Sequence, residues 1–548
     1  MKKLLLTGDS LSLKDLVHFA RRLGPPTVLE ITPEAENRVA EAARWIGGQV
    51  ESGRAIYGVT TGFGSNQDKI INPEDAKTLQ QNLIISHAVG YGPDLAEDIM
   101  RGAIVLRVNT LLKGHSGITP ETVQFFIDML NDHVYPAVPA KGSLGASGDL
   151  APLSHMVLPL LGRGAVYRQG QKITAAQWLD ETGRKPHSLT YKEGLALNNG
   201  TPVMTAVGAF ALYDARKLLH YATMSAALTG EALLARSSFL HPKVHRLRTA
   251  PRVRGQERVA GRLRQFFQGS KLIDYPFPLA NAADDHVPYP VGRREIVQNA
   301  YSIRCIPQVH GAVANAVEHV TDVVEMELNA VTDNPLIFTD SEEVVSAGNF
   351  HGEPLALPLE YLKVAVAELG SIAERRLYKL TDQHLNEGLP AYLSQGKPGL
   401  NSGVMIVQYV AASLVAENKV LCHPAAVDSI PTSENFEDHV SMGGLSAYHA
   451  LQVAENVQRI IASELFAAFQ AVSIRLRQLG FSQDDYSPLG AGTAAVMRCI
   501  AQAGIRPYVE DEWFYEHLNV VSNLLKGEKL LQAVDEAVGP CRDREEKP

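Results

Sequence analysis

Residues Lys141–Leu161 read KGSLGASGDLAPLSHMVLPLL, a run of small residues that leads into the pattern of a helix. Small side chains let the backbone bend sharply and approach other groups closely. Asp149 is the expected N-cap of the helix, and Pro152 is tolerated in its first turn. A helix start also provides N–H donors and a positive dipole end, which favour a nearby anion. The small residues of the loop are Gly142, Ser143, Gly145, Ala146, Ser147 and Gly148.

The residue types alone leave three interpretations of this loop open. It can be a tight turn before a buried helix, as most loops of this composition are. A phosphate cradle is poorly supported, because the pattern G-x-x-x-x-G-K-[ST] is absent. A serine nucleophile on a strand-to-helix elbow requires G-x-S-x-G, and Gly145-Ala146-Ser147-Gly148 has a different spacing. In that case Ser147 would act as a hydrolase nucleophile with His155 or His310.

A fourth interpretation comes from a resemblance. Ala146-Ser147-Gly148, within GSLGASGDLAPLSH, resembles the self-processing tripeptide of the histidine and aromatic amino acid ammonia-lyase family. The resemblance implies that the tripeptide cyclises and loses water to give a 4-methylidene-imidazol-5-one (MIO), so that no external cofactor is needed. The chemistry suits the residues, because Gly148 has no side chain to hinder attack of its nitrogen on the Ala146 carbonyl. Ser147 supplies the hydroxyl that leaves as water.

A second loop, YGVTTGFGS at residues 57–65, holds three glycines and by itself indicates only a mobile segment. Its spacing is not the dinucleotide-binding fingerprint. The string YGVTTGFG resembles the family's lid loop, which implies that Tyr57, as tyrosinate, is the catalytic base. A lone tyrosine would otherwise be expected to pack in the core with its hydroxyl hydrogen-bonded.

The segment VQNAYSIRCIPQVHG carries a candidate carboxylate clamp, in which Gln298, Tyr301 and Arg304 follow one another at steps of three. On one helix these residues would lie within about two turns. The forked guanidinium of Arg304 matches a carboxylate bidentately. The string resembles the family's substrate-carboxylate segment. The resemblance also implies that Asn199, in LNNGT, lies beside the electrophile and that Phe350, in AGNFHGEP, forms an aromatic wall near it.

Two further positions bear on the substrate. His87, in SHAVG, and Glu437, in NFEDHVSMG, match the histidine-specific members of the family, where aromatic-specific members carry other residues. A carboxylate can accept a hydrogen bond from an imidazole N–H, which a phenyl ring cannot donate. Phe436, Asn198 and Pro202 depart from the family pattern, and Phe436 would make the pocket more apolar. L-Histidine is therefore the expected substrate, with tyrosine or phenylalanine lyase or 2,3-aminomutase activity as alternatives.

Composition sets the class of protein. The chain has 548 residues, 45% hydrophobic residues and a net charge of −9, which argues against a nucleic-acid partner. Four distant cysteines without metal-binding spacing indicate reduced thiols, no metal site and a cytoplasmic protein. The opening MKKLLLTGD has an apolar run too short for a signal peptide, and no run suits a membrane span.

The remaining pattern is mainly α-helical. From Ser446 to Leu479 neither Gly nor Pro occurs, and apolar residues recur at helical spacing. Similar segments at 204–238, 309–330, 358–380 and 402–421 predict a long-helix bundle. The predicted domains are a loop-rich active-site region at 1–200, with lid loop 57–65 and MIO loop 142–149, a central bundle at 201–480 and a helical segment at 481–548. The family resemblance implies a fumarase-like superfamily architecture and a homotetramer with shared active sites. The rival from another class is an inactive helical scaffold.

Overall fold

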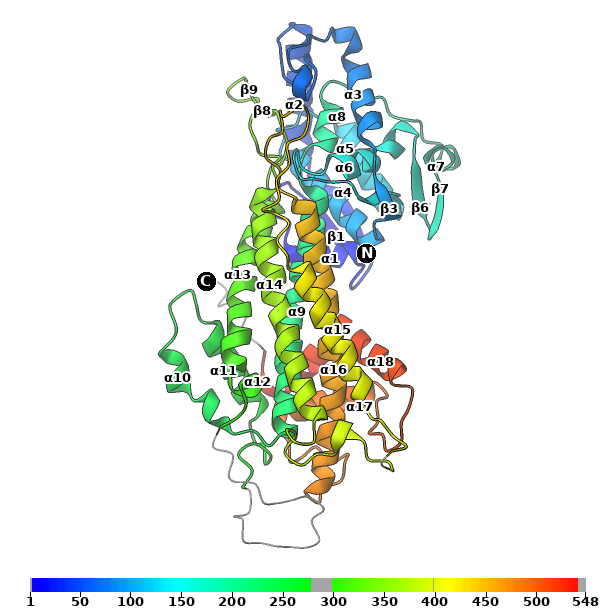
Figure 1. The fold of residues 1–548 in the computed structure, drawn as a ribbon. Helices are drawn as coiled ribbons and strands as arrows, with labels where there is room; N and C mark the ends of the chain where they lie inside the picture. The colour runs from blue at the N-terminus through cyan, green and yellow to red at the C-terminus, as the bar shows by residue number, and fades with distance from the viewer. Residues whose placement is uncertain (1, 277–297, 398, 541–548) are drawn as a thin grey trace. The chain divides into compact units, whose positions relative to one another are not determined.

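The computed structural model describes residues 2–276, 298–397 and 399–540, and it is mainly α-helical, as predicted (Figure 1). The chain forms two compact units, each built from several separate segments. Unit 1 holds residues 1–213, 319–361 and 424–451, and unit 2 holds residues 214–318, 362–423 and 452–548. Each unit is described by itself below.

Unit 1 contains the N-terminal helices and the strands. Its helices are α1 (Leu13–Ala20), α2 (Pro33–Glu51), α3 (Pro73–His87), α4 (Glu97–Leu111), α5 (Pro120–Asn131), α6 (Leu150–Val157), α7 (Ala175–Thr182) and α8 (Glu193–Asn198), with the 3₁₀ turns η1 (Gly64–Asn66) and η2 (Leu158–Leu161). Helix α4 is buried along most of its length, which makes it the centre of this unit's helical core.

The strands of unit 1 form small separate sheets. They are β1 (Lys2–Leu6), β2 (Thr27–Ile31), β3 (Tyr91–Asp94), β4 (Val134–Pro136), β5 (Pro139–Lys141), β6 (Ala165–Arg168), β7 (Gln171–Thr174), β8 (Leu336–Phe338) and β9 (Glu343–Val345). β1 pairs with β2 in parallel, whereas β3–β5, β4–β6–β7 and β8–β9 are antiparallel. β6 and β7 form a small hairpin. β5 matters for function, because the tripeptide loop follows it directly.

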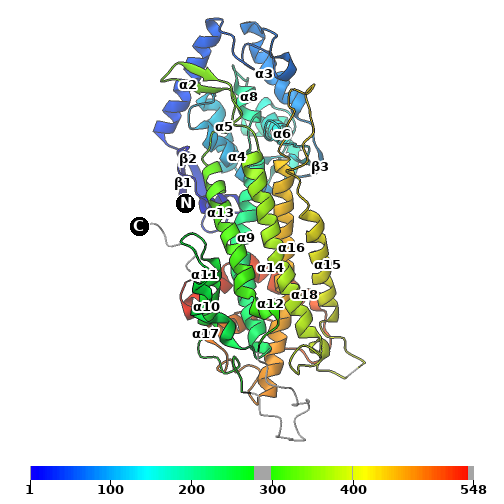
Figure 2. The same cartoon turned by 60° about the vertical axis from the view of Figure 1, so that its left-hand side comes forward.

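Four long helices contribute residues to both units: α9 (Pro202–Ala232), α13 (Ile306–Glu327), α14 (Glu353–Thr381) and α16 (Gly443–Gln478). The other helices of unit 2 are α10 (Pro242–Arg246), α11 (Gly255–Phe266), α12 (Tyr301–Arg304), α15 (Met405–Leu421), α17 (Ala491–Gln502), α18 (Phe514–Lys526) and α19 (Lys529–Val538), with η3 (Ser237–Leu240) and η4 (Ala391–Leu393). In unit 2 the long helices run side by side in both views, which is the predicted bundle (Figures 1 and 2).

Helix α16 is the central element of this bundle. The predicted apolar positions from Val453 to Val472 are all buried, and so are most residues between them. Within the described residues α16 alone has the length and hydropathy of a membrane-crossing helix, but 89% of that apolar window is buried inside the protein. It is therefore a core helix of the protein.

Candidate active site

The tripeptide lies in a tight turn between β5 and α6. This turn requires glycine at two positions, one just before the tripeptide and one within it. Gly145 and Gly148 have φ angles of 73° and 78°. A Cβ on Gly148 would lie 1.9 Å from the Gly200 carbonyl oxygen, and one on Gly145 would lie 2.3 Å from Ser441 Oγ. The Ser441 hydroxyl donates to the Gly145 carbonyl at 3.2 Å. The loop backbone is thus enclosed so closely that only glycine fits at either position.

Asp149 anchors the end of the loop. Its backbone N–H donates to the Gly200 carbonyl at 2.6 Å. Its carboxylate accepts the backbone N–H groups of Val203 and Met204, each at 2.9 Å, and the Ser143 hydroxyl at 3.1 Å. Asp149 holds the predicted N-cap position of α6, yet its side chain makes no cap bond there. The predicted N-cap position is therefore confirmed, but the side chain caps the first turn of α9 instead.

The burial of Asp149 has an electrostatic consequence. Burial raises the pKa of this carboxyl group to about 7, although its hydrogen bonds and the charge of Arg107 act in the opposite direction. Arg107 is itself fully buried, and burial lowers its pKa to about 10. Its guanidinium donates to the carbonyls of Ala196 and Thr332. The buried guanidinium of Arg107 and the buried carboxyl group of Asp149 therefore both belong to the surroundings of the tripeptide loop.

Tyr57 lies in the loop between α2 and α3. Its side chain is half-buried, and its hydroxyl oxygen accepts the backbone N–H of Gly64 at 3.1 Å. Gln80 holds the loop in place, because its amide donates to the Gly58 carbonyl and accepts from Leu195 N–H, both at 3.0 Å. This hydrogen bond and the two bonds of Gln80 fix the position of the phenol oxygen.

A cavity of about 290 Å³ opens beside the tripeptide, entirely within unit 1. Ala146 and Gly148 line it together with the predicted substrate residues His87 and Glu437. The Ser147 hydroxyl donates to Oε1 of Glu437 at 2.9 Å. Residues far apart in the sequence therefore meet at one cavity wall. The partner of Ser147 is a carboxylate rather than His155 or His310, so the catalytic Ser–His pair of a serine hydrolase is not formed.

Glu437 is held by its own loop. Its second carboxylate oxygen, Oε2, accepts the Thr432 hydroxyl at 2.9 Å. The backbones of the two residues are also joined by hydrogen bonds of 2.9 and 3.2 Å. Phe436 is 48% exposed and does not line the cavity.

His87 is the last residue of α3. Its Nδ1 lies 3.0 Å from the Ser86 hydroxyl. Burial lowers the pKa of its imidazole, and the Leu83 carbonyl and the Glu437 carboxylate, which favour protonation, offset only part of that effect. His87 is therefore mainly neutral at pH 7.

Asn199 and Phe350 lie in segments that contact the tripeptide loop or its anchor. Asn199 is 4% exposed at the C-cap of α8, and its Oδ1 is buried without a hydrogen-bond partner. The next residue, Gly200, donates its N–H to the Ser147 carbonyl at 3.2 Å. Phe350 is half-buried. Two residues further on, a Cβ on Gly352 would lie 2.6 Å from the loop-binding oxygen of Ser441.

Gln298, Tyr301 and Arg304 lie together in unit 2. The Arg304 guanidinium lies 4.7 Å from the centre of the Tyr301 ring and donates to the Gln298 side-chain oxygen. Tyr301 is 71% exposed, and Nε of Arg304 is buried without a partner. The sequence suggested one helix for all three residues, but α12 holds only Tyr301 and Arg304, and Gln298 precedes it. The cluster presents an amide, a phenol and a guanidinium, which are groups that bind a carboxylate.

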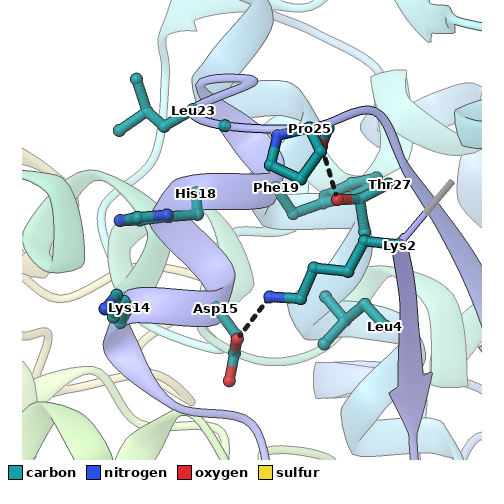
Figure 3. Close-up of a pocket in the computed structure, with 10 residues that line it drawn as sticks. Lys2, Leu4, Lys14, Asp15, His18, Phe19, Leu23, Pro25 and Thr27 are labelled. Carbon is teal, nitrogen blue, oxygen red and sulfur yellow. Dashed lines mark hydrogen bonds and ion pairs between the residues drawn. The ribbon is translucent and has the colours of Figure 1, made fainter.

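A second cavity of unit 1, of about 320 Å³, lies between β1, β2 and α1 (Figure 3). In it Lys2 and Asp15 form an ion pair of 3.8 Å, and the Thr27 hydroxyl donates to the Pro25 carbonyl at 3.0 Å. None of the site residues predicted from the sequence lines this cavity. The candidate site is therefore the cavity at the tripeptide.

The sequence as a whole matches the family model described as aromatic amino acid lyase over residues 11–502. This chain belongs to the aromatic amino acid lyase family. It is 43% identical to a histidine ammonia-lyase from Alkaliphilus oremlandii over 98% of this chain and 99% of that one. It is 44% identical to a histidine ammonia-lyase from Chloroflexus aurantiacus over 97% and 98% of the two chains.

Solved structures give the same fold. The crystal structure of histidine ammonia-lyase from Trypanosoma cruzi superposes with a TM-score of 0.85 at 40% identity, covering 98% of this chain and 96% of that one. A tyrosine aminomutase from Streptomyces globisporus superposes with a TM-score of 0.88 at 34% identity, covering 98% and 99% of the two chains. The mainly helical architecture predicted from the resemblance is thus confirmed for this aromatic amino acid lyase.

The residues around the tripeptide fit the MIO group that the family implies. The enclosure of Gly148 holds the glycine backbone in a tight turn, and Ala146 is only 8% exposed. Sequence reasoning missed the residues that support this aromatic amino acid lyase site from behind: Gln80, Arg107, Thr432 and Ser441. Thr432 acts through a local bond to Glu437, and the other three act through contacts between residues far apart in the sequence, which no local motif carries.

Proposed function

We propose that this enzyme eliminates ammonia from L-histidine to give urocanate. The observation that carries the proposal is the Glu437 carboxylate, which lies 2.9 Å from the Ser147 hydroxyl in a cavity that His87 also lines. Both side chains are hydrogen-bonding partners for an imidazole ring and are of no use to a phenyl ring. The exposure of Phe436 outside this cavity and the full-length similarity to histidine ammonia-lyases support the same substrate.

Different residues of this chain perform the separate tasks of the elimination. An MIO formed from Ala146-Ser147-Gly148 would supply the electrophile that makes the amine a leaving group. Tyr57 accepts the proton from the carbon next to the α-carbon, and the Gly64 N–H holds its oxygen in place. Gln298, Tyr301 and Arg304 bind the substrate carboxylate, with Arg304 as the charged donor. Asn199 and Phe350 border the reacting centre.

We further propose a cytoplasmic homotetramer in which partner subunits complete each site. Helices α14 and α15 expose large apolar side chains, including Leu357 at 53%, Ile406 at 55% and Tyr409 at 59%. Apolar helix faces of this kind mark protein–protein contacts. Light scattering should report four chains per particle, and dilution to monomers should abolish activity. A monomer with full activity would contradict the assembly.

The substrate is tested by incubating the enzyme separately with histidine, tyrosine and phenylalanine and following the absorbance of each unsaturated product. Urocanate should form fastest, because a site built to hydrogen-bond a ring rejects a ring without donors strongly. Glu437→Gln should lower kcat/KM for histidine and leave tyrosine and phenylalanine unchanged or improved. Phe436→Gln is the matched control and should change histidine turnover little. Cinnamate or coumarate forming faster than urocanate would contradict the proposal.

A further inference from the structure

The two side chains proposed to contact the substrate ring are each backed by a hydroxyl group. Ser86 binds His87, and Thr432 binds Glu437. Both hydroxyl residues line the cavity beside the tripeptide. Neither belongs to the groups that react, so their effect has to pass through the residues that they bind.

Each oxygen of the Glu437 carboxylate accepts one hydrogen bond from a hydroxyl group. Oε2 accepts the Thr432 hydroxyl, and Oε1 accepts the Ser147 hydroxyl. Ser147 loses that hydroxyl as water when the tripeptide cyclises, whereas Thr432 keeps its own. Processing therefore frees Oε1 while Oε2 stays fixed. A carboxylate oxygen left without a donor in a partly buried cavity favours a ligand that brings one.

The tautomer of His87 is assigned from the hydrogen bonds of Ser86. This hydroxyl donates to the Leu83 carbonyl at 3.2 Å, and a hydroxyl has one proton to give. With its proton on that carbonyl, the Ser86 oxygen accepts from Nδ1 of His87, 3.0 Å away, and we assign the ring proton to Nδ1 on that basis. A neutral imidazole has only one N–H, so Nε2, on the opposite edge of the ring, bears a lone pair.

We infer that Ser86 and Thr432 are positioning residues that fix His87 Nε2 and Glu437 Oε1 as hydrogen-bond acceptors, so that the cavity selects an amino acid whose ring carries an N–H. A ring of the same shape that offers only a lone pair is rejected, because two acceptors then face it without a donor. This inference rests on the proposed histidine activity and specifies which property of the ring is recognised.

The test compares L-histidine with β-(4-thiazolyl)-L-alanine, in which a ring sulfur replaces the N–H. Inhibition of urocanate formation gives the Ki of the analogue, and this Ki should exceed the KM of histidine at least about 100-fold. Thr432→Val should raise the KM for histidine about tenfold, with kcat changed less than about threefold and the Ki unchanged. Ser86→Ala removes one of the two groups that bind the His87 ring, the Leu83 carbonyl being the other, so the ring can present Nε2–H more readily. The Ki of the analogue should then fall about tenfold while the KM for histidine rises.

The controls retain the hydroxyl. Ser86→Thr and Thr432→Ser should restore wild-type discrimination, and thermal unfolding checks that each variant is folded. If Thr432→Val does not fold, Thr432→Ala removes the same hydroxyl and takes its place. A purely structural role would change the KM of histidine and the Ki of the analogue by the same factor, which would overturn the inference. A wild-type enzyme that forms no urocanate would instead count against the proposed function.

Discussion

Replacement of Asp149 tests the link between the tripeptide loop and α9. Asp149→Ala removes the acceptor of two backbone N–H groups, those of Val203 and Met204, in a fully buried position. Each buried donor left unpaired costs about 1–3 kcal/mol, so the variant should lose about 2–6 kcal/mol of unfolding free energy. Asp149→Asn keeps one oxygen for the same two donors, and its amide can donate to Ser143. It should be far less destabilised near pH 5.

The same carboxyl group predicts a pH dependence. Burial raises its pKa from 3.8 to about 7, so the folded protein holds a proton that the unfolded chain releases. The resulting stability is fully present below about pH 4 and is lost as the pH rises through 7. A shift of this size corresponds to about 4 kcal/mol. Asp149→Asn cannot ionise. Its unfolding free energy should therefore rise relative to that of the wild type by about that amount between pH 4 and pH 8.

Urea unfolding followed by circular dichroism at pH 4, 5 and 8 measures both effects. Asp180→Ala, at an exposed position of α7, is the control and should stay within about 0.5 kcal/mol of the wild type. The reasoning is refuted if Asp149→Ala is as stable as this control. It is also refuted if the stability difference between wild type and Asp149→Asn does not change with pH.

Three further variants test separate parts of the account. Tyr57→Phe should fold and bind substrate, and its kcat should fall about 10²–10⁴-fold; a fall of less than tenfold in steady-state kinetics would mean that another group takes the proton. Gly148→Ala places a Cβ 1.9 Å from the Gly200 oxygen, so near-ultraviolet spectra should show no MIO, and a wild-type spectrum would contradict the geometry. At Glu193, burial would raise the pKa, but hydrogen bonds from His187, Thr190, Thr119 and Thr122 lower it to about 2. Its stabilisation of about 3 kcal/mol is present above pH 4.5 and lost as the pH falls towards 2, so urea unfolding of Glu193→Gln should match the wild type only in acid.

The sequence predicted the elements that local patterns specify. The long apolar segments became α9, α13, α14, α15 and α16, and the glycines of the tripeptide loop adopt the tight turn that their size allows. Asp149 shows where this reasoning ended. Its position before an apolar run predicted an N-cap of α6, but its carboxylate binds the first turn of α9, more than 50 residues away in the sequence. Pairing between distant segments is a property of the fold and leaves no local signal.

The candidate site divides in the same way. Motif strings singled out Tyr57, His87, Glu437 and Arg304, and their catalytic roles stay predictions. The division of the chain at residues 200 and 480 also stays a prediction. Other residues hold these groups in place: Thr432 donates a hydrogen bond to Glu437, and Ser441 donates one to the Gly145 carbonyl. They are common polar residues that belong to no distinctive sequence pattern. Only their distances in the folded chain reveal them.

The central claim is that Ser147 becomes part of an electrophile that this enzyme uses on histidine. The most direct test is urocanate formation by purified wild type and Ser147→Ala, measured beside their near-ultraviolet difference spectrum. The account predicts a folded variant that lacks the MIO absorbance and nearly all activity, and a wild type that borohydride inactivates. Substantial urocanate formation by Ser147→Ala, or identical spectra for the two proteins, would contradict it.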